Sequence, residues 1–356
     1  MNLNRDDIRA AVATGTITEA QAASILALAE ARAGLRDRMS GLDEPFELFK
    51  GFNEIFIVVG LTILYGGWAG FTGLSVLFSG QPSSSSALLA LVGMGVLALL
   101  ARYFTLTRRM VAPSIALTIM FGLSATQLGA SIGAMVSTMT PIVWSLTSAI
   151  AGLCLLLYWV VFRVPFAMLL IAISVFATTF ALTLVSGASL LEAREMFLLT
   201  GTGFYSLITI GLGVVGLIVA LAFDFSDPHR VTRRAQNGFW LHIIAAPAIV
   251  NTIALTLFQE GTVSAQLILV AFLTAMALFA IIIDRRSFLV AGIGYVVALA
   301  FTVVEDNFFL VILLLGAVLV LLGAQWERMR GAILRALPDF PGKTRLPPYA
   351  SSKDTT

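Results

Sequence analysis

The chain has little charge. Asp, Glu, Lys and Arg make up 12% of its 356 residues, and the formal net charge at neutral pH is only +2. Soluble domains are usually about a quarter charged and about half apolar, whereas 58% of these residues are hydrophobic and the mean hydropathy is +0.95. This composition predicts a protein that lies mainly in a lipid bilayer, and the small, dispersed charge predicts no nucleic-acid partner.

Cysteine and cofactor motifs are scarce as well. The one cysteine, Cys154, lies in an apolar run, which excludes an intramolecular disulfide and a cysteine-based zinc site. The sequence has no Walker A loop, no dinucleotide-binding glycine motif in a strand–helix context and no HExxH pair. We therefore predict no cofactor, no metal and no nucleotide-driven pumping. The first 50 residues are polar, so no cleavable signal peptide is expected.

Long apolar runs are what the sequence does have. About 20 helical residues cross about 30 Å of hydrocarbon, and ten runs near that length can be found. The sequence therefore predicts an all-α polytopic membrane bundle with about ten transmembrane helices. Their approximate ranges are 55–78, 86–104, 111–136, 141–161, 165–186, 197–222, 238–258, 263–283, 288–304 and 307–326.

The basic residues give an independent test of this count. With ten spans, every Lys and Arg except Arg194 falls on one side of the membrane, and the opposite loops carry mainly Glu and Asp. Basic residues of short loops stay in the cytoplasm. The sequence therefore predicts a multi-pass protein of a bacterial inner membrane with both termini in the cytoplasm.

Four regions are expected along the chain. Residues 1–40 contain a small cytoplasmic helical hairpin with Gly15 as the first helix stop, and 41–54 form an interfacial lead-in with phenylalanines at helical spacing. Residues 55–326 form the bundle. Residues 327–356 combine an amphipathic helix with a disordered Pro-rich tail; the predicted apolar face of that helix is Trp326, Met329, Ile333 and Leu337.

Three stretches carry a family resemblance: "GFNEIFIVVGL", "RRAQNGFWLHIIAAPAIV" and "DRRSFLVAGIGY". Together with the hairpin before a many-span bundle, they resemble a group of uncharacterised bacterial inner-membrane proteins. The resemblance implies a multi-pass inner-membrane protein, and it implies no functional residues.

Polar side chains inside the spans are the candidate functional residues. His242 and Pro247 lie in the seventh span, where a proline removes one backbone donor and exposes a carbonyl. Because histidine titrates near physiological pH, the pair is a candidate cytoplasmic gate; the alternative is an interfacial histidine bonded to headgroups or to a neighbouring helix, with Pro247 as a packing kink. No Asp, Glu, Lys or Arg lies at the centre of a span, and Glu54, Asp224, Asp284 and Glu305 are all placed at helix ends. That pattern argues against a carboxylate-based ion or proton antiporter.

Two polar stripes recur at helical spacing and are candidates for lining a substrate path. The alternative is that they are interhelical hydrogen bonds. The third and sixth spans carry, respectively, Ser124, Gln127 and Ser131, and Thr202, Tyr205, Ser206 and Thr209.

Three further motifs have a functional and a structural interpretation. Gly66-xxx-Gly70 and Gly129-xxx-Gly133 are expected to let helices of this chain pack closely, rather than to form a dimer face. A serine–histidine dyad of Ser131 and His242 would resemble that of rhomboid proteases. A metal site formed by Asp224, Asp227 and His229 is a further alternative, and Asp-Pro there also fits a simple turn.

Function is expected to be non-enzymatic. The leading hypothesis is a membrane protein that binds or translocates a small neutral or lipid-like molecule. The alternatives are a membrane scaffold that recruits a cytoplasmic protein partner through residues 1–40, and an intramembrane serine hydrolase. Ten spans also allow two sets of five related by inversion, although the halves show no sequence match.

Overall fold

The computed structural model describes the larger part of the chain. Two compact units are distinguished, residues 1–45 and 46–356, and each is described by itself. The described residues are 8, 10–12, 14–17, 21, 25, 28, 53–79, 84–189, 196–199, 204–228, 230, 232–303, 313, 316–317, 319–321 and 323–347.

The first unit contains a helical turn that ends at a glycine. Gly15 has φ +71°, in the left-handed region, and the backbone N–H of Thr14, Gly15 and Thr16 donate to preceding carbonyls. Glycine occupies this conformation without steric cost and therefore commonly ends helices. The predicted stop at Gly15 is confirmed. Most of the predicted hairpin and of the lead-in at 41–54 lies outside the described residues.

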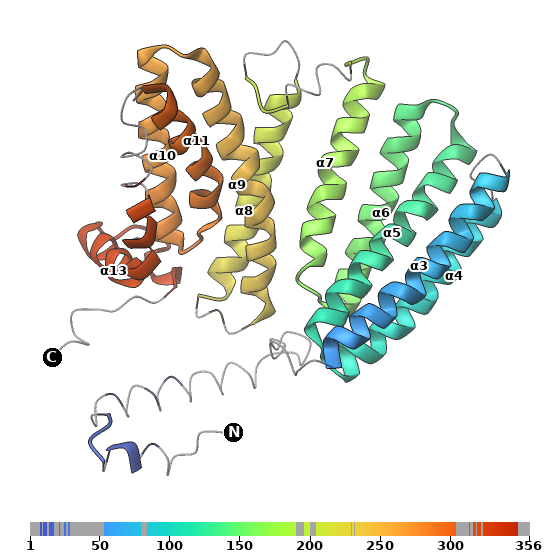
Figure 1. Cartoon of the computed structure of the whole chain (residues 1–356), viewed down its shortest axis with the longest axis horizontal. Helices are drawn as coiled ribbons and strands as arrows, with labels where there is room; N and C mark the ends of the chain where they lie inside the picture. The colour runs from blue at the N-terminus through green and yellow to red at the C-terminus, as the bar shows by residue number, and fades with distance from the viewer. Residues whose placement is uncertain are drawn as a thin grey trace. The chain divides into compact units, whose positions relative to one another are not determined.

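Every regular element among the described residues of the second unit is a helix. The first five long helices form one packed group (Figure 1). Their bounds are α3 (Asn53–Ser79), α4 (Ser84–Ala101), α5 (Val111–Val136), α6 (Thr140–Phe162) and α7 (Ala167–Val185), and α4 continues as the π-helical turn η1 (Arg102–Thr107).

Helix α5 is the centre of this group. It contacts α3, α4, α6 and α7, and it approaches α6 most closely because two glycines allow the backbones to touch. A Cβ at Gly129 would lie 2.6 Å from the carbonyl oxygen of Thr147, and one at Gly133 would lie 3.1 Å from that of Val143. The expected packing role of Gly129-xxx-Gly133 is confirmed.

The other glycine pair behaves differently. A Cβ at Gly66 or at Gly70 would meet no atom within 4 Å among the described residues. The prediction that Gly66 and Gly70 pack closely against another helix of this chain is therefore wrong for the described residues. The reason is that α3 turns these positions outward while Leu61 and Thr72 face the bundle.

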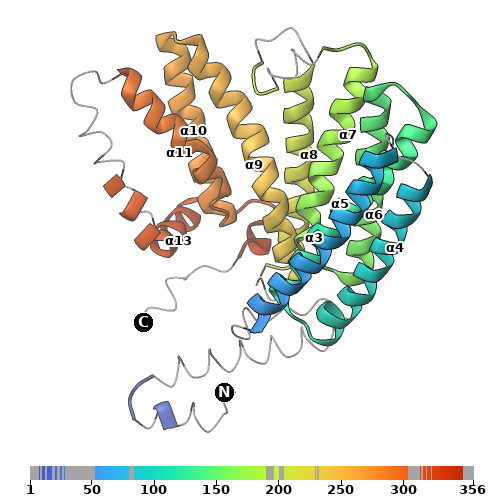
Figure 2. The same ribbon diagram turned by 45° about the vertical axis from the view of Figure 1, so that its right-hand side comes forward.

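The second group contains α8 (Tyr205–Ser226), α9 (Arg233–Glu260), α10 (Val263–Ile283) and α11 (Ser287–Val303). Helix α9 packs along α8 and also contacts α10 and α11. The buried core of α9, α10 and α11 is separate from the buried core of α3–α6. The two groups meet where α7 contacts α8 and α9 (Figure 2). We call this contact the seam.

Eight described helices are long and apolar enough to cross a membrane, and they correspond to the first eight predicted spans. The uncertain division between the third and fourth spans is confirmed, because α5 ends at Val136 and α6 begins at Thr140. The ninth predicted span corresponds to α11, whose apolar part Ser287–Leu299 is shorter. Half of the tenth, 307–326, lies outside the described residues, so the ten-span count stays a prediction.

Helix α13 (Trp326–Ala336) follows the bundle and contacts α10. Its most buried positions are Trp326, Arg330 and Leu334, one turn apart, whereas Met329 and Ile333 of the predicted apolar face are half-buried. The next eleven residues have a defined course that includes the short helix η3 (Lys343–Arg345). Residues 348–356 lie outside the described residues.

Candidate functional site

Three ionisable side chains meet inside the second helix group. The carboxylate of Asp224, near the end of α8, lies 2.8 Å from Nε2 of His242 on α9. Arg285, which follows α10, donates from Nε to the same carboxylate oxygen at 3.1 Å and from Nη2 to the other. The side chain of His242 is fully buried, and those of Asp224 and Arg285 are 8% exposed. We call these three residues the charge cluster.

The local sequence explains how α8 and α9 come close enough to form the cluster. Gly238 lies one turn before His242 on the same face of α9. A Cβ at Gly238 would lie 2.6 Å from Oδ1 of Asp224 and 3.0 Å from the carbonyl oxygen of Ala220. Arg285 also donates from Nη2 to the carbonyl oxygen of Ala235 at 2.7 Å, so the guanidinium bridges α8 and the first turn of α9.

The turn that carries Arg285 also contacts the loop before α9 and helix α13. Asp284 has φ +56° and caps α10. Its carboxylate accepts from Nη1 of Arg230 at 2.8 Å and from Nε1 of Trp326 at 2.6 Å. Arg286 lies over the Trp326 ring, 5.0 Å from its centroid. Three consecutive residues, 284–286, therefore connect α8–α9, the loop before α9 and helix α13.

Arg230 lies outside the spans, in the loop before α9. Burial lowers the pKa of its guanidinium, and the nearby positive charge of Arg285 acts in the same direction, whereas Asp284 and Asp224 raise it. A guanidinium stays protonated in proteins, so Arg230 remains a cation paired with Asp284.

The cluster adds to what the sequence predicted. Asp224 lies near the end of α8, as expected, and both Asp224 and Arg285 are buried against α9. Position along a helix does not reveal which way the helix end faces, and α8 continues to Ser226 beyond Asp224. The available signal was the pair Gly238 and His242, one turn apart, which leaves room for a partner side chain.

The predicted gate residues are placed in different surroundings. His242 faces Asp224 and the ring of Phe288, so its partner is a neighbouring helix and not a headgroup. Its Nδ1 has no hydrogen-bond partner among the described residues. Pro247 is half-buried, and α9 continues through it to Glu260.

The first predicted stripe connects α5 to its neighbours. Ser124 is hydrogen-bonded to the hydroxyl of Tyr65 on α3 at 3.2 Å, and Ser131 to Ser86 on α4 at 2.7 Å. Gln127 is half-buried. Ser131 is bonded to Ser86 and to its own helix, and His242 to Asp224, so the two are not bonded to each other as a catalytic dyad requires.

The second predicted stripe lies at the seam. Tyr205, Ser206 and Thr209 are buried, and the Tyr205 ring lies 5.5 Å from that of Phe180 on α7. Thr202 and His229 lie outside the described residues. Asp227 accepts from the N–H and hydroxyl of Thr232 at 2.8 Å, and no group of three potential metal ligands occurs among the residues that were described.

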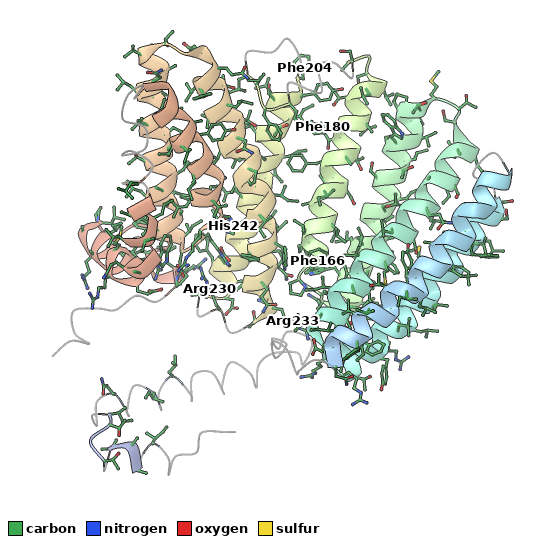
Figure 3. All side chains as sticks on the ribbon, viewed as in Figure 1. Phe166, Phe180, Phe204, Arg230, Arg233 and His242 are labelled. Carbon is green, nitrogen blue, oxygen red and sulfur yellow. The ribbon has the colours of Figure 1, made fainter. Side chains whose placement is uncertain are left out.

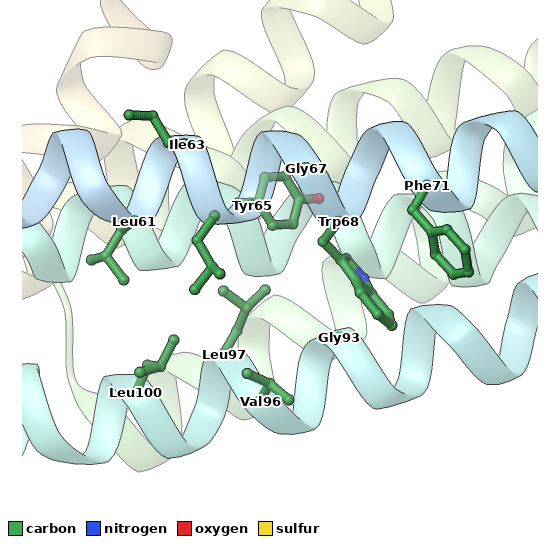
Figure 4. A pocket seen from close by; sticks show the side chains of 11 residues that line it. Leu61, Ile63, Tyr65, Gly67, Trp68, Phe71, Gly93, Val96, Leu97 and Leu100 are labelled. Carbon is green, nitrogen blue, oxygen red and sulfur yellow. The ribbon is translucent and has the colours of Figure 1, made fainter.

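A large apolar groove lies between α3 and α4 (Figure 4). Its volume is 610 Å³, and Tyr65, Trp68 and Phe71 are its aromatic residues. The Trp68 indole lies against Gly93, where an added Cβ would be 2.6 Å from Nε1. That Nε1 is buried and has no hydrogen-bond partner among the described side chains and backbone. The groove exists because α3 and α4 are each held on α5 and contact each other little.

A smaller apolar cavity of 190 Å³ lies in the seam, between α7, α8 and α9. Phe166 and Phe180 lie at two levels of the seam (Figure 3). Phe166 packs edge-on against Trp240, with centroids 4.7 Å apart. At the same end, Nη1 of Arg233 donates to the carbonyl oxygens of Phe162 and Arg163. The ring pairs Phe166–Trp240 and Phe180–Tyr205 therefore join the two helix groups at two levels of the seam, and none of these rings lines the cavity.

No known family model, curated protein or solved structure matches this chain.

Proposed function

We propose that this membrane protein binds a lipid-like molecule, whose apolar chain occupies the groove between α3 and α4. The observation that carries the proposal is the groove itself: 610 Å³, lined by apolar side chains, with one buried indole N–H that has no partner. Ligand pockets usually measure about 300–1,000 Å³ and combine an apolar lining with a few polar groups. The Arg-rich turns at Arg109, Arg163 and Arg230 support the topology with both termini in the cytoplasm of a bacterial inner membrane.

The chemistry of the lining defines the ligand class. No charged residue lines the groove, so the part of the ligand that enters it is neutral. A buried donor without a partner costs about 1–3 kcal/mol, and a ligand with an ester or other carbonyl oxygen beside its chain would remove that cost at Trp68. Tyr65 also lines the groove and is bonded to Ser124, which connects the first predicted stripe to this site.

A pair of glycine variants tests the proposal. Gly67 lines the groove and an added Cβ there would meet no atom within 4 Å, so the backbone accepts a side chain and Gly67→Leu adds apolar volume at the groove. Gly95→Leu is the matched control, because Gly95 is exposed on α4, an added Cβ there also meets no atom, and it does not line the groove. The protein is reconstituted in liposomes that contain a phosphatidylethanolamine with a photoreactive acyl chain. After illumination, the labelled residues are mapped by mass spectrometry.

We expect the label on the groove residues of the unaltered protein and of Gly95→Leu, and a several-fold lower label there in Gly67→Leu. Equal labelling of the groove in all three proteins, or labelling no greater than on other lipid-facing helices, would contradict the proposal.

Movement of the ligand across the membrane is the second candidate, and the seam cavity favours it. The cavity lies between two helix groups with separate cores, and in this proposal the Phe166–Trp240 and Phe180–Tyr205 pairs, at two levels of the same seam, serve as gates. Single cysteines at Val219 and Ile244, in a Cys154→Ala background, should react with a small thiol reagent added from one side. Protection from both sides, with reaction at an exposed loop control, would exclude an open path.

A further inference from the structure

The charge cluster is an unusual way to join two membrane helices. At the α5–α6 contact, by comparison, the two helices approach each other closely at glycines. Burying an ionisable group in a membrane protein is costly, and such groups usually pair with one another and mark functional positions. Here three of them are buried together around one carboxylate.

The hydrogen bond to Asp224 determines which ring nitrogen of His242 carries the proton. Asp224 and Arg285 form an ion pair, and their charges cancel. Nε2 of His242 lies 2.8 Å from a carboxylate oxygen, which is an acceptor, so Nε2 must be the protonated nitrogen. In the neutral ring Nδ1 is then a bare lone pair, and it has no partner among the described residues. An unpaired acceptor in a neutral ring is a site where one proton can bind.

We propose that Nδ1 of His242 is a proton-binding site, and that the bound proton weakens the contact between Arg285 and Asp224. The proton turns the ring into a cation that competes with the guanidinium for the same carboxylate. The charged groups facing His242 are Asp224 from α8 and Arg285 from the turn after α10, with Arg230, Asp284 and Arg330 further out. From α11 it faces the uncharged ring of Phe288.

The turn at 284–286 carries this change to the surface of the protein. Arg285 binds the cluster, while its neighbours Asp284 and Arg286 hold Trp326 at the start of α13. When Arg285 loses Asp224, its guanidinium keeps only the carbonyl oxygen of Ala235 as an inward partner, so the turn is held less firmly and the surroundings of Trp326 change. Proton binding at His242 therefore alters how α13 is held. This inference is independent of the lipid-like ligand.

The chain is well suited to a direct test, because it has only two histidines. His229→Asn leaves His242 as the single imidazole, and ¹⁵N NMR of the labelled ring in a bilayer distinguishes the two neutral tautomers from the imidazolium. Fluorotryptophan incorporation gives a ¹⁹F signal for Trp326, identified by its loss in Trp326→Phe. Both signals are followed from about pH 8 to about pH 5, the range in which histidine side chains ordinarily change charge.

We expect an Nε2–H tautomer at the upper end, an imidazolium at the lower end, and a Trp326 signal that shifts with the same midpoint. His242→Gln is the key variant, because its amide N–H can still donate to Asp224 but its carbonyl oxygen is not basic enough to bind a proton in this pH range; the Trp326 shift should be lost in it and retained in His229→Asn. A ring that stays neutral throughout, or an Nδ1–H tautomer, would overturn the proton site. A Trp326 shift that persists in His242→Gln, or that is absent while the ring titrates, would overturn the coupling to α13.

Discussion

Two glycines with the same sequence motif should respond in opposite ways to the same substitution. Gly129 and Gly66 each begin a Gly-xxx-Gly pair in a membrane helix. An added Cβ at Gly129 would lie 2.6 Å from the carbonyl oxygen and 2.8 Å from the Cα of Thr147, about 0.8 Å short of the 3.4 Å at which ordinary contact begins. Both atoms are backbone, so the whole of α6 must move. At Gly66 the same Cβ meets nothing within 4 Å.

The magnitudes follow from two opposing effects. Alanine is favoured over glycine inside a helix by about 0.5–1 kcal/mol, and overpacking a filled core costs about 1–3 kcal/mol. Gly66→Ala has only the first effect, so the free energy of unfolding should rise by up to about 1 kcal/mol. Gly129→Ala has both, and because backbone cannot rotate away, we expect a net loss of about 1–2 kcal/mol.

Reversible unfolding in mixed micelles, followed by circular dichroism at increasing denaturant, measures both variants against the unaltered protein. A Gly129→Ala protein as stable as Gly66→Ala would contradict this prediction, because that result would mean that α5 and α6 are not in backbone contact. A large loss in Gly66→Ala would instead show that this face of α3 is packed.

Three other substitutions follow from the contacts of the second helix group. Asp224→Ala leaves Arg285 buried without a counter-charge and should cost about 3–5 kcal/mol of unfolding free energy, of which the double variant with Arg285→Ala should recover a part; equal losses in both would contradict the ion pair. Thr232→Ala removes the side chain that caps α9 and should cost about 1 kcal/mol in the same assay, with no loss if the cap is unimportant. Trp326→Phe keeps a ring at that position but loses the hydrogen bond to Asp284, and protease cleavage within α13 should become about tenfold faster for each 1.4 kcal/mol of lost docking energy; an unchanged rate would show that α13 is held elsewhere.

The fold class could be predicted because it depends on local properties of the sequence. Length and hydropathy of each run determine whether it can span a bilayer, and the eight long helices appear where those runs were found. Even the three-residue break after Val136 was predicted, since Ser137 and Thr140-Pro141 interrupt the apolar pattern. Helix ends were less accurate: α4 continues through η1 to Thr107, and α9 begins at Arg233 rather than at 238.

The charge cluster could not be predicted because it depends on how helices face one another. Asp224, His242 and Arg285 are 18 and 43 residues apart along the chain, and only the packing of α8 on α9 brings them together. The sequence places Asp224 at a helix end and Arg285 in a loop, and position along the chain does not reveal the direction of a side chain. The same limitation explains why the two Gly-xxx-Gly pairs were indistinguishable in the sequence.

The α3–α4 groove and the charge cluster lie in different helix groups and differ in chemistry. We therefore expect them to act independently. The α3–α4 groove has no charged lining and belongs to the group whose helices are joined by glycines and serine hydroxyls. The charge cluster belongs to the group in which a turn, two helices and α13 are joined by ions. Substitutions more than about 7–10 Å apart with no shared partner usually act independently. Gly67→Leu should therefore leave the His242 titration unchanged and His242→Gln should leave groove labelling unchanged, unless the seam at α7 transmits a change between the groups. Failure of that independence would be direct evidence that the ligand and the proton are coupled through the seam.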